Sequence, residues 1–250
     1  MQCQQKPVTI RFEVRKMKIE VWSDYVCPFC YIGKRELERA LASTGFAAQA
    51  EVVFKAYQLD PQAPAHSDET IEQALAKKYG ATAEAMKQQT AGIAQRAKEV
   101  GLDYNFDDMH PANTFKAHRL AKYAETVGKE KEMTERLLRA YFVENQKIGH
   151  EDVLVALAKE IGLDEEATKA ALQDERFAAE TLVDMQQAQQ IGVRGVPFFV
   201  LNDKYAISGA QPKDVFERAI RQVAEEENLK PKLQMFGDES ATCDGDHCDF

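Results

Sequence analysis

In this chain of 250 residues, the side chains best placed to do chemistry are two cysteines separated by two residues. Cys27 and Cys30 enclose Pro28 and Phe29, so they lie one turn apart if a helix begins there. Disulfides are attacked by thiolates, and the free N–H groups of a helix N-terminus lower the pKa of a cysteine. We therefore expect Cys27 to be exposed at that terminus as the attacking thiolate, and Cys30 to resolve the mixed disulfide.

The elements around the motif fit this interpretation. An apolar-polar run over 19–26 reads as a strand, and 31–42 reads as a helix. A strand that leads into a helix with C-x-x-C in its first turn is typical of thioredoxin-like redox proteins, and Pro28 suits that turn. Half of a zinc site is one alternative, but no second C-x-x-C or H-x-x-x-H pair follows at finger-like spacing. The other alternative is that both cysteines are buried and have only a structural role. A proline between two such cysteines is unusual, which counts against this alternative.

A second pattern lies near the other end of the chain. Gly195, Val196 and Pro197 precede the apolar run 198–201. A proline cannot occupy the interior of a central strand, so Pro197 marks the first residue of this strand, where a cis peptide bond is an option.

Together these segments resemble a known family. Residues 22–24, the C-x-x-C motif and 195–197 are similar to the DsbA family of thiol–disulfide oxidoreductases, and the resemblance spans roughly 17–223. Residues 113–120 and 208–212 resemble its FrnE-like branch, which is related to 2-hydroxychromene-2-carboxylate isomerases and kappa-class glutathione transferases.

The resemblance implies roles for individual residues. Cys27 would attack, Cys30 would resolve, and Pro197 would be a cis-proline packed against the active-site disulfide. Val196 would offer its backbone N–H and C=O to an extended substrate, as an added strand does. The isomerase and transferase relatives usually carry serine in place of Cys27, because they activate bound glutathione. The cysteine here favours disulfide chemistry, which needs no organic cofactor.

The pattern of the whole chain predicts an α/β, thioredoxin-like fold with a large all-helical insertion domain. Strands are expected at 51–57, 198–201 and 205–207, the last two joined by a turn at Asn202 and Asp203, and almost all of 69–191 reads as helix. The expected domains are an N-terminal extension 1–16, a thioredoxin-like domain 17–61 and 192–228, a helical insertion 62–191 and a flexible tail 229–250.

Two ionisable residues could tune the motif. His118 lies in a helix that we expect Asn113 to cap, and it is a candidate modulator of Cys27, with a packing role as the alternative. Asp24 would oppose thiolate formation if its carboxylate faced Cys27.

The acidic tail contains a second cysteine pair, Cys243 and Cys248, with His247 between them. It could be a secondary redox pair that exchanges electrons with the motif, as in some FrnE-like proteins. The same three residues are weak candidates for metal ligands, although no metal is expected, and a tail with unreactive thiols is the third alternative.

Composition limits the partners. The net charge of -9 argues against nucleic-acid binding, and no run approaches the ~20 apolar residues that span a membrane. The first residues lack a secretory pattern, so a cytoplasmic location is expected. Expected partners are protein or small-molecule disulfides and dithiols, with a recycling reductant or oxidant, and the chain is expected to be a monomer or small homo-oligomer.

The predicted function is therefore that of a thiol–disulfide oxidoreductase or isomerase. One alternative is a glutathione-dependent isomerase or transferase, with glutathione as co-substrate. The other is a metal- or redox-sensing module centred on Cys243 and Cys248.

Overall fold

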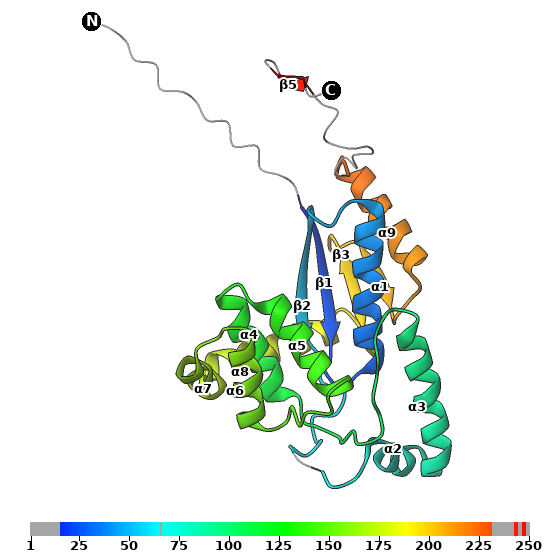
Figure 1. Cartoon of the computed structure of the whole chain (residues 1–250), viewed down its shortest axis with the longest axis vertical. Coiled ribbons are helices and arrows are strands. Elements are labelled where there is room, and N and C mark those ends of the chain that lie inside the picture. The colour runs from blue at the N-terminus through cyan, green and yellow to red at the C-terminus, as the bar shows by residue number, and fades with distance from the viewer. Residues whose placement is uncertain (1–15, 66, 232–242, 245–246, 249–250) are drawn as a thin grey trace, which may run out of the picture.

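The structure is a computed structural model that describes residues 16–65, 67–231, 243–244 and 247–248. Within these residues its main sheet has four strands in the order β2-β1-β3-β4 (Figure 1). They are β1 (Met17–Ser23), β2 (Ala50–Ala56), β3 (Phe198–Leu201) and β4 (Tyr205–Ser208). β2 is parallel to β1, β3 is antiparallel to β1, and β4 is antiparallel to β3. All of the expected extension except Lys16 lies outside the described residues.

One face of the sheet is covered by α1 (Pro28–Thr44) and α9 (Lys213–Glu226), which lie side by side in Figure 1. Side chains alternate across a strand, and every second residue of β1 packs into this layer. The core of the layer is formed by Met17, Ile19, Val21, Leu37, Leu41, Phe199, Leu201, Phe216 and Ile220. This apolar layer fixes the start of α1 above the end of β1.

The other face of the sheet is covered by α8 (Glu175–Gln190). Trp22 of β1 packs there against Ala188 and Val193, and its indole N–H donates to the carbonyl oxygen of Asp184 at 3.0 Å. A buried indole N–H needs such a partner, so this bond fixes α8 on the sheet.

The remaining helices also lie between β2 and β3 in the chain. They are α2 (Ile71–Tyr79), α3 (Ala83–Lys98), α4 (Phe115–Thr126), α5 (Glu130–Phe142), α6 (Glu151–Glu160) and α7 (Glu165–Gln173). Figure 1 shows α4 to α8 gathered beside β2, whereas α2 and α3 lie on the opposite side, near α1. The predicted thioredoxin-like fold with a large helical insertion is confirmed, and its helices form two groups that the sequence pattern did not separate.

Two carboxylates attach the larger helical group to the free edge of β2. Glu130 at the start of α5 accepts the Phe54 N–H at 2.9 Å, and Asp184 of α8 accepts the Ala56 N–H at 2.9 Å. An edge strand with open N–H groups is a site of unwanted strand pairing. These bonds close that edge and hold α5 and α8 next to the end of β1.

The hairpin between β3 and β4 turns where the sequence predicts. Asn202 and Asp203 have φ of 48 and 55, the left-handed conformation that a two-residue turn of type I′ requires. The expected strand 51–57 is displaced by one residue, to Ala50–Ala56. None of the helices in the described part of the chain is long and apolar enough to cross a membrane.

Candidate active site

The C-x-x-C motif forms the N-terminal turn of α1. Cys27 is the N-cap residue, with φ -91 and ψ 112, and Pro28 is the first helical residue. The Cys30 N–H donates to the Cys27 carbonyl oxygen at 3.0 Å, which closes the turn. Both cysteines are free thiols. The turn therefore places Cys27 where the unpaired N–H groups of a helix stabilise negative charge.

Cys27 is less accessible than the sequence analysis expects. Only 4% of its surface is exposed, so the expectation of an exposed thiol is wrong for this structure. The reason is the loop that leads into β3, because the Cys27 thiol donates to the carbonyl oxygen of Val196 at 3.4 Å. The Val196–Pro197 peptide bond is cis. The structure thus brings together Cys27, Cys30, Val196 and Pro197, although about 170 residues separate the two segments.

Close contact between α1 and Pro197 depends on a glycine. A Cβ atom added to Gly33 would lie 3.0 Å from Cγ of Pro197 and 3.1 Å from Cζ of Phe199. To admit even a methyl group at these distances, Pro197 and Phe199 would have to shift by a few tenths of an ångström. Gly33 therefore permits the approach of the motif helix to the cis-proline loop.

Replacing Gly33 with valine is expected to lower the free energy of unfolding by about 1–3 kcal/mol, since the added atoms overpack the contact with Pro197. Gly92 is a matched control, because it also lies within a helix but a Cβ there meets nothing within 4 Å. Gly92→Val should change the free energy of unfolding by less than about 1 kcal/mol. Urea unfolding of both variants is the measurement. Equal losses in the two variants would contradict the proposed contact.

Cys30 lies deeper than Cys27 and is 2% exposed. Burial raises the pKa of the Cys30 thiol well above its ordinary value, and the neighbouring Cys27 adds to the rise. Hydrogen bonds from the Ser23 side chain and the Asp24 N–H partly oppose it, the latter over 3.4 Å. Cys30 is therefore protonated at neutral pH and must lose its proton before it can attack a disulfide.

The Asp24 carboxylate is fully buried and bound by two groups. Its Oδ2 accepts the Leu59 N–H at 2.8 Å, and its Oδ1 lies 3.4 Å from Nε2 of His118. The His118 ring packs against Tyr25, with ring centroids 4.7 Å apart. Among the contacts of the described residues, His118 thus meets Asp24 and Tyr25 and neither cysteine. A modulating role for His118 stays a prediction, and any influence on Cys27 would act through Asp24.

The helical insertion contributes two contacts to the motif that the sequence analysis missed. Tyr104 donates its hydroxyl hydrogen to the Pro28 carbonyl oxygen at 2.7 Å. Arg96 of α3 lies over the Phe29 ring, 5.6 Å from its centroid, and donates to the carbonyl oxygen of Ala210. No local pattern marks these residues, since both act over long stretches of chain. Arg96 thus attaches α3 to the motif, and Tyr104 attaches the segment between α3 and α4.

A charged cluster attaches the first turns of α1 to α5. The Glu135 carboxylate accepts hydrogen bonds from Tyr31 and Lys34, both at 2.6 Å, and from Arg35. Burial alone would raise the pKa of Glu135, but these bonds outweigh it and hold the pKa at about 2. Glu135 is therefore ionised at neutral pH and fixes α1 beyond Cys30.

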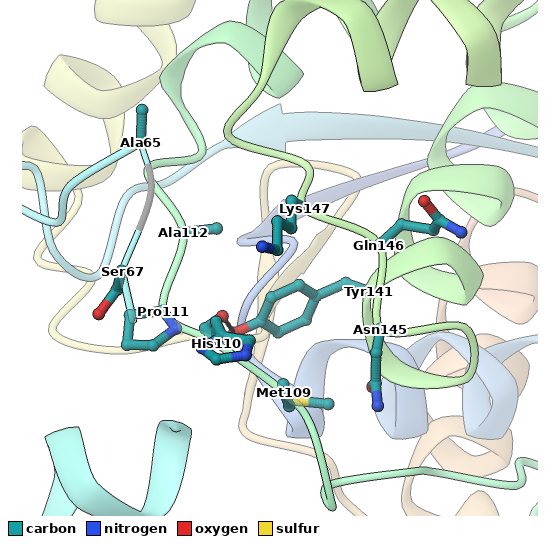
Figure 2. Close-up of a pocket in the computed structure, with 10 residues that line it drawn as sticks. All are labelled: Ala65, Ser67, Met109, His110, Pro111, Ala112, Tyr141, Asn145, Gln146 and Lys147. Atoms are coloured by element: carbon teal, nitrogen blue, oxygen red, sulfur yellow. Dashed lines mark hydrogen bonds between the residues drawn. The ribbon is translucent and has the colours of Figure 1, made fainter. Parts of the chain in front are cut away.

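A pocket near α5, drawn in Figure 2, does not include the motif. Its volume is about 10 Å³. Tyr141 points across it and donates to the His110 carbonyl oxygen at 2.9 Å. The lining residues are Ala65, Ser67, Met109, His110, Pro111, Ala112, Tyr141, Asn145, Gln146 and Lys147. Its volume suits one water molecule and not a substrate.

The tail contains two short strands, β5 (Cys243–Asp244) and β6 (His247–Cys248), which pair antiparallel. The register places Cys243 opposite Cys248. Their side chains lie outside the described part of the structure, so their role as a secondary redox pair or as metal ligands with His247 stays a prediction. Within the part of the chain that the structure describes, no three acidic, histidine or cysteine side chains lie close enough together to hold a metal ion.

The sheet order, the cysteine pair at a helix N-terminus and the cis-proline loop opposite define a thioredoxin-fold protein. The family model of the DSBA-like thioredoxin domain matches residues 18–221. The chain therefore belongs to the DSBA-like thioredoxin domain family, and the resemblance noted in the sequence is confirmed.

Relatives of known sequence or structure agree with this assignment. The chain is 33% identical to the uncharacterized protein YwbO of Bacillus subtilis (strain 168) over 204 residues, which cover 81% of this chain and 94% of YwbO. It is also 33% identical to the probable DsbA oxidoreductase SCO1869 from Streptomyces coelicolor, whose crystal structure matches with a TM-score of 0.79 over 94% of this chain and 99% of that one. A 2-hydroxychromene-2-carboxylate isomerase shares the fold at 14% identity, with a TM-score of 0.61 over 85% of this chain and 99% of the isomerase.

Proposed function

We propose that this protein is a thiol–disulfide oxidoreductase or isomerase that exchanges disulfides with protein or small thiol substrates through Cys27 and Cys30. The observation that carries the proposal is the geometry at the start of α1. Cys27 caps the helix, Cys30 follows one turn later, and the Val196 carbonyl oxygen of the cis-proline loop lies 3.4 Å from the Cys27 sulfur. Membership of the DSBA-like family and the 33% identity to a probable DsbA oxidoreductase support it.

The reaction consists of two exchanges at sulfur. The Cys27 thiolate attacks one sulfur of the substrate disulfide, forms a mixed disulfide and releases the other sulfur as a thiolate. The Cys30 thiolate then attacks the Cys27 sulfur and releases the second substrate thiolate. Two electrons pass from the motif to the substrate, and the motif ends as a disulfide. The reverse sequence oxidises a dithiol, so the cysteines need no organic cofactor.

The substrate would lie along the loop before β3. The Val196 N–H and C=O would pair with an extended chain, while Pro197 would keep this loop against the disulfide. Displacement of the Val196 carbonyl from the Cys27 thiol would give the substrate access to the sulfur. Val26 and Phe29 beside the motif are partly exposed apolar residues and favour an apolar segment next to the substrate cysteine.

A redox titration in glutathione buffers tests the proposal. Alkylation and mass mapping at each potential should show Cys27 and Cys30 converting together between dithiol and disulfide. A midpoint well above about -220 mV would keep the motif reduced in a cytosolic glutathione pool and favour reduction or isomerisation of substrates. The cytoplasmic location itself stays a prediction. If Cys27 binds glutathione but never forms a disulfide with Cys30, the proposed function is wrong. The alternative of a glutathione-dependent isomerase or transferase is then correct.

The same titration follows Cys243 and Cys248. We propose that they form a secondary redox pair, and the register that places them opposite each other supports a bond between them. Conversion of this pair at a single potential is the expected result. A sensing module centred on the tail would instead keep its response when Cys27 and Cys30 are both replaced.

A further inference from the structure

The outer side of β4 is an open edge of the main sheet. In the described part of the chain β4 pairs only with β3, whereas carboxylates of α5 and α8 close the edge of β2. The Gly209 N–H donates to the Pro197 carbonyl oxygen at 2.8 Å. Hydrogen-bonded and non-hydrogen-bonded pairs alternate along antiparallel strands. From this pair and the register of the hairpin, the backbone groups of Ala206 and Ser208 point away from β3.

One of these outward groups already has a partner. The Ser208 carbonyl oxygen accepts the side-chain amide of Gln211 at 2.8 Å. The Ser208 N–H and both backbone groups of Ala206 face outward, and both residues are exposed. Proteins usually cover such an edge, because its open groups pair readily with other strands.

An apolar strip of α9 runs beside the β4 edge. Glu226 near the end of α9 accepts a hydrogen bond from the Tyr205 hydroxyl of β4, so this face of the helix looks toward β4. Val215 and Ala219 precede Glu226 by eleven and seven residues and share that face. Both are only partly buried. A strand added beside β4 would cover these two side chains.

The first residues of the chain have the pattern of such a strand. Residues 1–15 lie outside the part that the structure describes. From 8 to 14, apolar and polar residues alternate, as they do in a strand with one buried face. The apolar residues are Val8, Ile10, Phe12 and Val14. This segment directly precedes β1, so it is tethered to the sheet that carries the open edge.

We propose that residues 7–10 form an additional strand that pairs antiparallel with β4 of the same chain. Thr9 lies opposite Ala206, and the two residues exchange both backbone hydrogen bonds. Pro7 lies opposite Ser208 and accepts its N–H. Proline has no N–H of its own, and none is needed there because Gln211 already occupies the Ser208 carbonyl oxygen.

The same register places the apolar side chains against α9. Val8 lies opposite Ile207, whose side chain packs into the layer of α1 and α9. Ile10 lies opposite Tyr205, and both apolar residues face the strip of Val215 and Ala219. The added strand also stabilises the hairpin whose next residue, Gly209, binds the cis-proline loop. The inference does not depend on the proposed function.

The chain is long enough for this path. Seven residues lead from Ile10 to Met17 at the start of β1 and reach up to about 23–25 Å. The added strand lies three strand spacings from β1, about 14 Å. The Asn202 N–H donates to the Lys18 carbonyl oxygen at 2.9 Å, so β1 begins beside the turn of the hairpin. An antiparallel strand ends on that side, and the link 11–16 passes around the turn.

The charge of the link fits the path. Residues 11–16 contain three basic side chains and one acidic side chain. The turn presents Asp203, which is 75% exposed and lies 3.9 Å from the Lys18 amine. Lys204 in the same turn is held 2.6 Å from Glu226. The link therefore brings basic side chains to an exposed carboxylate, and water limits the gain to a small one.

Amide hydrogen exchange in the full chain tests the proposal. The amides of Ala206 and Ser208 should exchange at least about 100-fold more slowly than those of an unstructured peptide. Val8→Ser combined with Ile10→Ser removes the apolar contacts and changes no charge. This double variant should speed the exchange of both amides about 10-fold or more.

A matched double variant serves as the control. Gln5→Ser combined with Thr9→Ser changes two polar residues of the same segment and should leave both rates within about twofold. A substitution on the edge itself gives a second test. Ala206→Pro removes an outward N–H and keeps the bonds between β4 and β3. It should speed exchange of the Thr9 amide about 10-fold or more, while an unchanged Ile207 amide shows that β4 is intact.

Three results would overturn the docked strand. Exchange of Ala206 and Ser208 at the rate of an unstructured peptide would show that the edge is open. Slow exchange that the Val8 and Ile10 substitutions leave unchanged would show that something else covers it. Protection that rises with protein concentration, together with a dimer in sedimentation velocity, would assign the strand to a second copy of the chain.

Discussion

Replacement of Cys27 by serine is expected to abolish disulfide exchange, with a fall of at least about 1000-fold in the rate at which the protein reduces glutathione disulfide. A serine hydroxyl is not ionised at neutral pH, and its oxygen cannot form the mixed disulfide that Cys30 resolves. The position of residue 27 at the N-cap would be preserved, because serine is itself a favoured N-cap residue. The loss would therefore report the chemistry of the sulfur and not damage to α1.

Cys30→Ser is the informative partner of this variant. It keeps the attacking sulfur, so it should trap a mixed disulfide at Cys27 that is visible as a mass increase of one glutathionyl group. A glutathione-dependent isomerase predicts a different pattern, since its relatives carry serine at the position of Cys27. If Cys27→Ser keeps or gains a glutathione-dependent isomerase rate on an aromatic substrate, that alternative is correct and disulfide exchange is not the function.

The positions of the motif residues could be predicted because each depends on a short sequence pattern. The spacing of Cys27 and Cys30 needs only one helical turn, and the place of Pro197 follows from the apolar strand behind it. The turn at Asn202 and Asp203 is equally local. The start of α4 is less well predicted. The sequence predicts Asn113 as the N-cap, but the N-cap is Thr114. Asn113 precedes it by one residue, and its side chain accepts the N–H of Phe115.

The environment of the motif could not be predicted, because it is made by contacts between distant segments. The burial of Cys27 comes from Val196, which is 169 residues away, and the contact of Tyr104 with Pro28 spans 76 residues. The division of the helices into two groups depends likewise on which faces pack together. Glu130 looks in the sequence like any exposed acidic residue at a helix start. Burial raises the pKa of Glu130 to about 7, and this burial arises only when α5 packs against the edge of β2.

Replacement of Asp184 by alanine is expected to lower the free energy of unfolding by about 3–5 kcal/mol, the range for removal of one partner from a buried ion pair. The Asp184 side chain is 4% exposed and lies 2.6 Å from the Lys122 amine and 3.3 Å from that of Lys55. It also accepts the Ala56 N–H at the edge of β2. Its loss would remove the nearest carboxylate from both amines, leaving Lys122 with Glu125 and Lys55 with Glu20, each at 3.6 Å, and would leave the Ala56 N–H without its partner. Urea unfolding at pH 7 measures the effect.

The controls separate the buried charge from the helix itself. Glu180→Ala, one turn earlier on α8, removes a carboxylate that is 44% exposed and should cost less than about 1 kcal/mol. Adding Lys122→Met to Asp184→Ala should recover part of the lost stability, because an amine that has lost its nearest carboxylate disappears and apolar replacement of a buried pair is often neutral. No recovery would mean that the bond to Ala56, and not the charge of Lys122, dominates. The edge of β2 would then be the contact by which α8 chiefly stabilises the sheet that carries Cys27.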